Sequence, residues 1–79
     1  MKITVTQEDI EKGKRGCRNC PIALATNRTT LLDAAVYPHC IISVDMGTVW
    51  VLPKKAQQFI QRFDDGKPVH PFTFDIELP

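Results

Sequence analysis

The feature that most constrains the fold is an amphipathic segment that begins at Pro53 and is followed by Gly66. Proline suits the first turn of a helix, and glycine is common just after its last turn. Apolar residues between them recur at intervals of three and four, which places them on one helical face. They are Ala56, Phe59, Ile60 and Phe63. The pattern predicts a helix whose apolar face another part of the chain must cover.

Two apolar segments before this helix predict a β-hairpin. Residues 41–45 and 48–52 flank the dipeptide Met46-Gly47, which has the length of a two-residue hairpin turn. Pairing about that turn makes one face aliphatic, with Trp50 on the other face. The expected pairs are Val44 with Val49 and Ile42 with Val51. We expect the Pro53 helix to cover this aliphatic face.

The other segments are shorter. They predict strands at Lys2–Thr6 and Phe72–Leu78 and a helical turn at Leu31–Ala35. A helix is predicted at Gln7–Lys12, with a capping box from Thr6 and Asp9. A second helix is predicted at Pro21–Arg28, capped by Asn19 or Cys20. The coarse order is β-α-α-β-β-α-β. It predicts a single α+β domain over residues 1–79, with a mainly antiparallel sheet and the amphipathic helix on its face.

Composition excludes several functions. The chain has 79 residues, 43% hydrophobic and 24% charged, and its apolar runs are far shorter than a membrane helix needs. A net charge of +1 argues against a duplex-DNA binder. The N-terminus carries no secretory signal, so we expect a cytoplasmic protein. Because so small a core supplies little stability, a ligand, a metal or a second subunit is expected to help, and a homo-oligomer is one such form.

Three cysteines suggest a metal or packing role. Cys17 and Cys20 have the spacing of a zinc half-site, which His39, Cys40 or His70 would have to complete. Adjacent residues make a poor second half, so we favour half-buried thiols that pack the loop. A redox role is disfavoured because a predicted helix separates the first strand from Cys17. No signature of an enzyme is present, and we predict that the chain is not one.

A basic loop precedes the helix at Pro21. Residues 13–19 contain two glycines and three cations, and they lead into a helix start whose N–H groups attract anions. A phosphate or nucleotide would sit there, although cations in a loop are often only solvated. The candidate contacts are Arg15, Arg18, Asn19 and Arg28, with Trp50 or Tyr37 as stacking groups. Lys54 and Lys55 lie at the start of another helix, where the dipole disfavours cations and a partner is weakly indicated.

Two stretches carry a resemblance that covers most of the chain. They are Cys17-Arg-Asn-Cys20-Pro-Ile-Ala-Leu-Ala25 and Phe59-Ile60-Gln-Arg-Phe63-Asp-Asp-Gly66-Lys-Pro-Val69-His-Pro71-Phe72-Thr-Phe74. The chain resembles a group of short uncharacterised proteins encoded by bacteriophages and prophages. Cys40 is not part of that group's pattern.

The resemblance implies a small binding protein in the host cytoplasm that counteracts antiviral defence. Capture of a phosphorylated nucleotide signal at the basic loop is the first hypothesis. The alternatives are inhibition of a host complex by protein contact, with a host defence protein as the partner, and a zinc-stabilised interaction domain.

Overall fold

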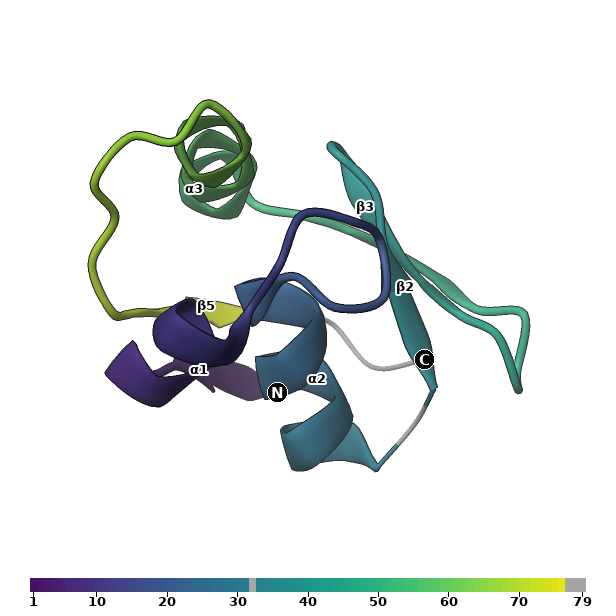
Figure 1. The fold of residues 1–79 in the computed structure, drawn as a ribbon. Helices are drawn as coiled ribbons and strands as arrows, with labels where there is room; N and C mark the ends of the chain where they lie inside the picture. The colour runs from purple at the N-terminus through teal and green to yellow at the C-terminus, as the bar shows by residue number, and fades with distance from the viewer. Residues whose placement is uncertain (32, 77–79) are drawn as a thin grey trace.

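The computed structural model describes residues 1–31 and 33–76. Its helices are α1 (Gln7–Lys12), α2 (Pro21–Thr30) and α3 (Lys54–Asp64). Its strands are β1 (Lys2–Val5), β2 (Ala34–Val36), β3 (Cys40–Ser43), β4 (Val49–Val51) and β5 (Phe72–Asp75). The pairing is antiparallel throughout these strands and divides them into two sheets, β1-β5 and β2-β3-β4. Helix α2 contacts both β1 and β2 and so joins the sheets (Figure 1).

The α+β class, the antiparallel pairing and the predicted order of elements are confirmed, with β2 as an additional short strand. The N-terminal prediction also holds in detail. Thr6 caps α1 through its side chain, and Asp9 bonds back to the Thr6 N–H. Of the two predicted caps for α2, Cys20 is the one used. The end of the expected last strand, residues 77–78, lies outside the described part of the chain.

The helical turn predicted for Leu31–Ala35 is wrong where the structure describes it. Helix α2 ends at Thr30, and its C-cap residue Leu31 has a left-handed φ of 60°. Ala34 and Ala35 instead pair with Ser43 and Ile42 in β2. Alanine has a high helix propensity, but propensity is a weak preference that tertiary pairing overrides. Both alanines are buried, so packing decides their conformation.

The predicted hairpin forms with a different register and a longer turn. Ile42 pairs with Val49 and Ile41 with Trp50, so each pairing is displaced by two residues from the prediction. The Gly47 N–H donates to the Ser43 carbonyl at 2.8 Å, and Gly47 has a left-handed φ of 67°. The turn therefore runs from residue 44 to residue 47 instead of over Met46-Gly47 alone.

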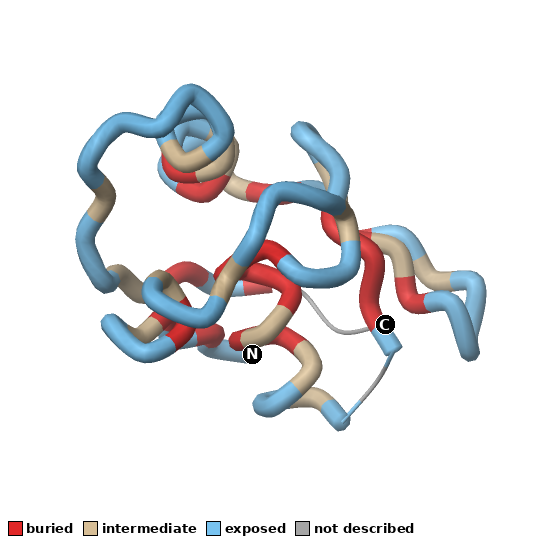
Figure 2. Tube along the Cα trace, viewed as in Figure 1, coloured by how far each residue is buried: buried red, intermediate tan, exposed pale blue. Residues whose placement is uncertain are grey.

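The inward face of the hairpin also differs from the prediction. Ile41 and Trp50 are buried at 0% and 4% exposure, whereas Val49 and Val51 are 57% and 78% exposed. Helix α3 does not cover the aliphatic face. Its Phe59 stacks on Phe72 of β5, with ring centroids 4.8 Å apart. Figure 2 shows the buried residues gathered where α2 faces the strands.

Candidate functional site

The basic loop is held in place by main-chain hydrogen bonds. The Lys14 N–H donates to the Asn19 carbonyl at 2.8 Å, and the Cys17 carbonyl accepts from the Val36 N–H at 2.6 Å. Lys14, Arg15 and Asn19 are exposed. Arg18 forms an exposed ion pair with Asp33, whose hydrogen bond and charge raise the pKa of the guanidinium. The loop therefore presents Lys14 and Arg15 to solvent, with Arg18 bound to a carboxylate.

The N-terminus of α2 is closed instead of open. The Cys20 thiol accepts a hydrogen bond from the Ala23 N–H at 3.4 Å, and the residues of the first turn, Pro21, Ile22 and Ala23, are buried. Burial raises the pKa of the Cys20 thiol, so the sulfur stays protonated at neutral pH. The capped and buried first turn therefore leaves little exposed surface for an anion at this helix start.

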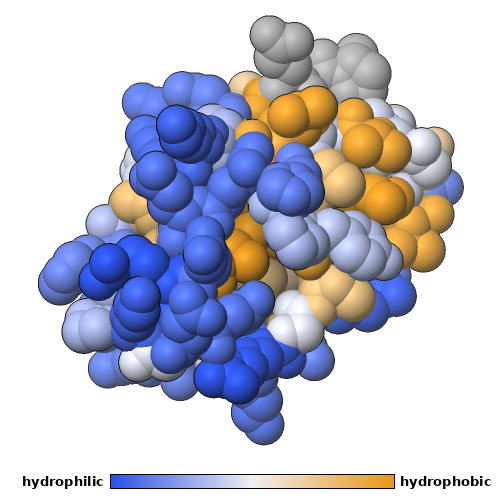
Figure 3. Space-filling model, turned by 90° about the horizontal axis from the view of Figure 1, so that it is seen from above, coloured by the Kyte–Doolittle hydropathy of each residue, from blue (hydrophilic) through white to orange (hydrophobic). Residues whose placement is uncertain are grey.

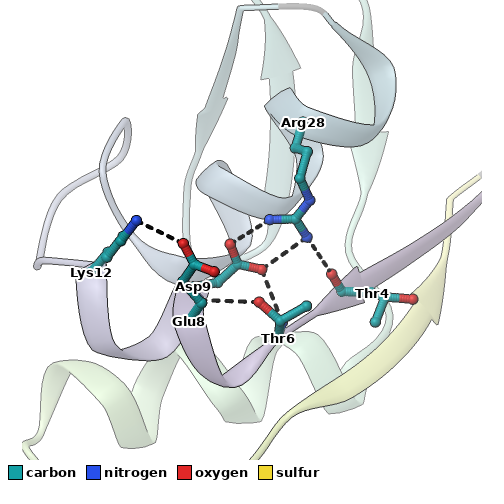
Figure 4. A network of polar contacts seen from close by, with 6 residues as sticks. All are labelled: Thr4, Thr6, Glu8, Asp9, Lys12 and Arg28. Atoms are coloured by element: carbon teal, nitrogen blue, oxygen red, sulfur yellow. Dashed lines mark hydrogen bonds and ion pairs between the residues drawn. The ribbon is translucent and has the colours of Figure 1, made fainter.

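Arg28 lies elsewhere, in the polar network of Figure 4. Its Nη1 donates to Asp9 Oδ1 at 2.6 Å, and its Nη2 donates to Asp9 Oδ2 and to the Thr4 carbonyl, both at 3.0 Å. Asp9 also accepts from the Thr6 N–H at 2.9 Å. Asp9 is almost wholly buried, with 4% of the residue exposed. Arg28 thus connects α2 to the β1-α1 corner, and it is committed to a structural carboxylate.

Trp50 is part of the core and presents no face to a ligand. Its exposed fraction is 4%, and its Nε1 has no hydrogen-bond partner among the residues described. Tyr37 is 43% exposed and remains accessible. Of the predicted anion contacts, the structure brings Arg15, Arg18 and Asn19 into one loop and places Arg28 and Trp50 away from it in other roles.

The cysteines do not assemble a metal centre. Within residues 1–31 and 33–76, no group of three or more His, Cys, Asp or Glu side chains is arranged to hold a metal ion. This range includes all four ligands of the zinc alternative, which are Cys17, Cys20, His39 and Cys40. Cys20 caps α2, and His39 Nδ1 lies 3.1 Å from Gln57 Oε1. Cys20 and His39 are thus engaged in contacts with different parts of the chain.

A shallow groove lies beside His39, between the turn after β2 and α3. Its volume is about 500 Å³, and most of the residues that line it have amide or charged side chains. Gln57 is one of the lining residues, and its Nε2 donates to the Leu52 carbonyl at 2.8 Å. The remaining lining side chains come mainly from α3, including Gln58, Gln61 and Asp64. We find no convergent set of catalytic groups among these residues.

The structure shows a second surface, the outer face of the three-stranded sheet. Register and burial place six residues on it, and we call them the outer sheet face: Tyr37, Cys40, Ile42, Val44, Val49 and Val51. Figure 3 shows hydrophobic side chains gathered on the side of the molecule where the hairpin projects. The aliphatic pattern in the sequence identifies this face, but the expectation that α3 covers it is wrong, because the face is exposed to solvent.

The rim of the outer sheet face is polar. Asp33 stands beside Val44, because the Val44 N–H donates to the Asp33 carbonyl at 2.8 Å. Asp33 carries the ion pair with Arg18 described above. The basic loop thus borders the apolar face through one of its own arginines.

Comparisons of the chain with known protein families, with curated proteins and with solved structures gave no match. Among the described helices, none has the length and apolar character needed to cross a membrane.

Proposed function

We propose that this protein is a non-enzymatic binding protein that holds another protein through the outer sheet face. The observation that carries the proposal is that the hairpin buries a polar side chain and exposes apolar ones. Ser43 is fully buried on the inner side, while Val44, Val49 and Val51 are half or more exposed on the outer side. Exposed apolar side chains that lie together in a small protein mark an interaction surface.

The chemistry of the face favours a protein over a small molecule. It is an open sheet surface of aliphatic side chains with Tyr37 at one side, and it has few groups that could orient a small polar ligand. Protein interfaces combine an apolar, aromatic centre with a polar rim. The Arg18–Asp33 ion pair supplies such a rim. In the phage context that the sequence suggests, the partner is a host protein whose assembly or activity is blocked by contact.

Nucleotide capture is the weaker candidate. Its support is the basic loop, where Lys14 and Arg15 are exposed and form no ion pair among the described residues. The predicted helix start, Arg28 and the stacking tryptophan have other roles. Two flexible cations without a shaped pocket bind an anion weakly and with little selectivity.

The experiment is affinity capture from host lysate followed by reconstitution. The chain would be compared with a double variant that carries Tyr37→Ala and Val44→Lys. Both substitutions are at exposed positions of the outer sheet face. The matched control adds charge to the exposed side of α3 with Gln58→Lys. We expect a specific host protein that is identified by mass spectrometry, binds the purified chain, and binds the face variant at least tenfold more weakly.

The control should retain the affinity of the unaltered chain within about twofold. Equal binding by the face variant, or no protein whose purified form binds the chain, would overturn the proposal. Circular dichroism on each variant verifies that loss of binding is not loss of folding.

A further inference from the structure

We propose that β4 pairs with the β4 strand of a second copy of this chain across a two-fold axis, which joins the two three-stranded sheets into one. The inference concerns the main-chain edge of the sheet and goes beyond the proposed function, which concerns its outer face. Edge strands expose unpaired N–H and C=O groups, and these groups favour the addition of another strand.

The two edges of the three-stranded sheet differ. At the β2 edge, the Ala34 N–H donates to Asn27 Oδ1 at 2.8 Å, and the Val36 N–H donates to the Cys17 carbonyl at 2.6 Å. The chain thus satisfies the outward donors of β2 with its own groups. This edge is closed to a second strand.

At the β4 edge the outward groups are open. The Ser43 N–H donates to the Thr48 carbonyl and the Leu52 N–H to the His39 carbonyl, at 2.8 and 3.0 Å. Along an antiparallel strand, the N–H and C=O groups of successive residues point alternately to one side and the other. Thr48, Trp50 and Leu52 therefore direct theirs toward β3. Val49 and Val51 direct theirs away from it. In the described part of the chain, nothing bonds the N–H of Val49 or Val51.

Two-fold symmetry provides a register in which the unpaired main-chain groups of both Val49 and Val51 form hydrogen bonds. With Trp50 on the axis, Val49 of each copy stands opposite Val51 of the other, and both N–H and both C=O groups of each pair are used. A shift in one direction places a valine opposite Pro53, which has no N–H to donate. A shift in the other direction leaves Val51 opposite the hairpin turn. The symmetric register is therefore the favoured one.

Charge supports the antiparallel arrangement. Asp45 lies in the hairpin turn before β4, and Lys54 and Lys55 follow β4 at the start of α3. All three are exposed, and none forms an ion pair within the described residues. An antiparallel second copy brings the acidic end of one β4 beside the basic end of the other, twice over. This arrangement gives the two lysines, which are disfavoured at a helix start, an opposite charge.

The valine side chains also gain cover. Val49 and Val51 are 57% and 78% exposed in the single chain, and in the paired strands those of the two copies become cross-strand neighbours on the outer face. The two outer sheet faces then form one continuous surface. The dimer would thus present a broader apolar surface to a protein partner than either copy alone.

The test is the self-association of the full chain in sedimentation equilibrium. Val51→Pro removes an outward N–H that makes no internal hydrogen bond, and proline is tolerated on edge strands. Val51→Thr is the matched control, because it keeps the N–H and the branched shape. We expect a reversible dimer that Val51→Pro weakens at least tenfold and Val51→Thr changes by less than threefold. A chain that stays monomeric at millimolar concentration, or equal dimerisation of both variants, would overturn the proposal.

Two further measurements test the strand register without using the Val51→Pro variant. Amide hydrogen exchange of Val49 and Val51 should slow as the concentration of the unaltered chain rises, whereas the Trp50 amide should not change. Asp45→Lys alone should weaken the dimer about threefold to tenfold, and adding Lys54→Glu and Lys55→Glu should restore it. Exchange at Val49 and Val51 that is independent of concentration contradicts the pairing. The variant with Tyr37→Ala and Val44→Lys should still dimerise, because it leaves the β4 edge unchanged. Loss of dimerisation and loss of partner binding can therefore be observed separately.

Discussion

The guanidinium of Arg28 holds the carboxylate of Asp9 in a two-point contact, with Nη1–Oδ1 and Nη2–Oδ2 distances of 2.6 and 3.0 Å (Figure 4). The two residues lie on α2 and α1, and Arg28 also reaches the carbonyl of Thr4 in β1. A planar donor fork matches a carboxylate in a way that a single ammonium cannot. This contact ties α2 to both α1 and β1.

Arg28→Ala should lower the free energy of unfolding by about 2 kcal/mol, because it leaves a buried carboxylate without its cation. Chemical denaturation monitored by circular dichroism measures the change. Lys12→Ala is the control, since the Lys12–Glu8 pair is fully on the surface, and it should leave the unfolding midpoint unchanged. Equal effects of the two substitutions would show that the Arg28 contact contributes nothing beyond a surface ion pair.

The same carboxylate should make stability depend on acid pH. Burial alone would raise the pKa of Asp9, but hydrogen bonds from Arg28 and Thr6 hold it below its ordinary value. The stabilisation is therefore complete above the unfolded pKa of about 4 and is lost as the pH falls toward the lower pKa of the folded state. Denaturation series from pH 7 to pH 2 should show this loss. Asp9→Asn should flatten the acid slope, and a slope identical to that of the unaltered chain would exclude Asp9 as its source.

Local sequence patterns predicted the helices well where one feature, such as a capping box or the spacing of apolar residues, was clear. The capping box of Thr6 and Asp9 gave the start of α1, and the spacing of Phe59 and Phe63 gave α3. The hairpin register could not be predicted in this way. It depends on whether Gly47 closes a two-residue or a four-residue turn, and both turns fit the residues between Ser43 and Thr48. A displacement by two residues keeps the same side chains together on each face. The aliphatic residues lie on the surface because the core covers the opposite face, which carries Ile41, Ser43 and Trp50.

The site predictions depended on contacts between distant parts of the chain. A run of cations indicates where positive charge lies in the sequence, but not that Arg18 meets Asp33 or that Arg28 meets Asp9. Those carboxylates lie 15 and 19 residues away from their arginines. The cap position of Cys20 was predicted, yet the burial of the turn behind it follows from packing that no local pattern encodes.

Gly13 is required by a close approach between α1 and α2. A Cβ atom at this position would lie 2.6 Å from the ring of Pro21 and 2.8 Å from the Asp9 carbonyl oxygen. Gly13→Ala should therefore destabilise the chain by about 1 to 3 kcal/mol, as overpacking does. Gly16→Ala is the comparison, because a Cβ there meets no atom within 4 Å and only the positive φ of 131° is strained. Thermal unfolding of both variants measures the difference, and an unaffected Gly13→Ala would contradict the close approach.

The weaker nucleotide hypothesis makes a prediction of its own. If the basic loop captures a phosphorylated nucleotide, Arg15→Ala should reduce binding in calorimetry by about threefold to tenfold, since it removes one partly screened charge contact. Arg28→Lys should leave binding unchanged, because that side chain faces Asp9. A panel of cyclic and ADP-ribose-type nucleotides is the appropriate set of ligands. No binding by any member, with no effect of Arg15→Ala on thermal stability in their presence, would remove nucleotide capture.

Trp50 offers a direct test of the inward-facing hairpin. Its ring is buried against the core, while its Nε1 has no hydrogen-bond partner among the described residues. Trp50→Phe retains most of the apolar contact and removes an unsatisfied donor, so its cost should stay near 1 kcal/mol. Trp50→Ala should cost about 3 to 5 kcal/mol, which is comparable to the whole stability of so small a domain. Denaturant titration of the two variants distinguishes these values. If Trp50→Ala unfolded no more readily than Trp50→Phe, the indole would have to lie on the surface, and the assignment of the valine face to solvent would fail with it.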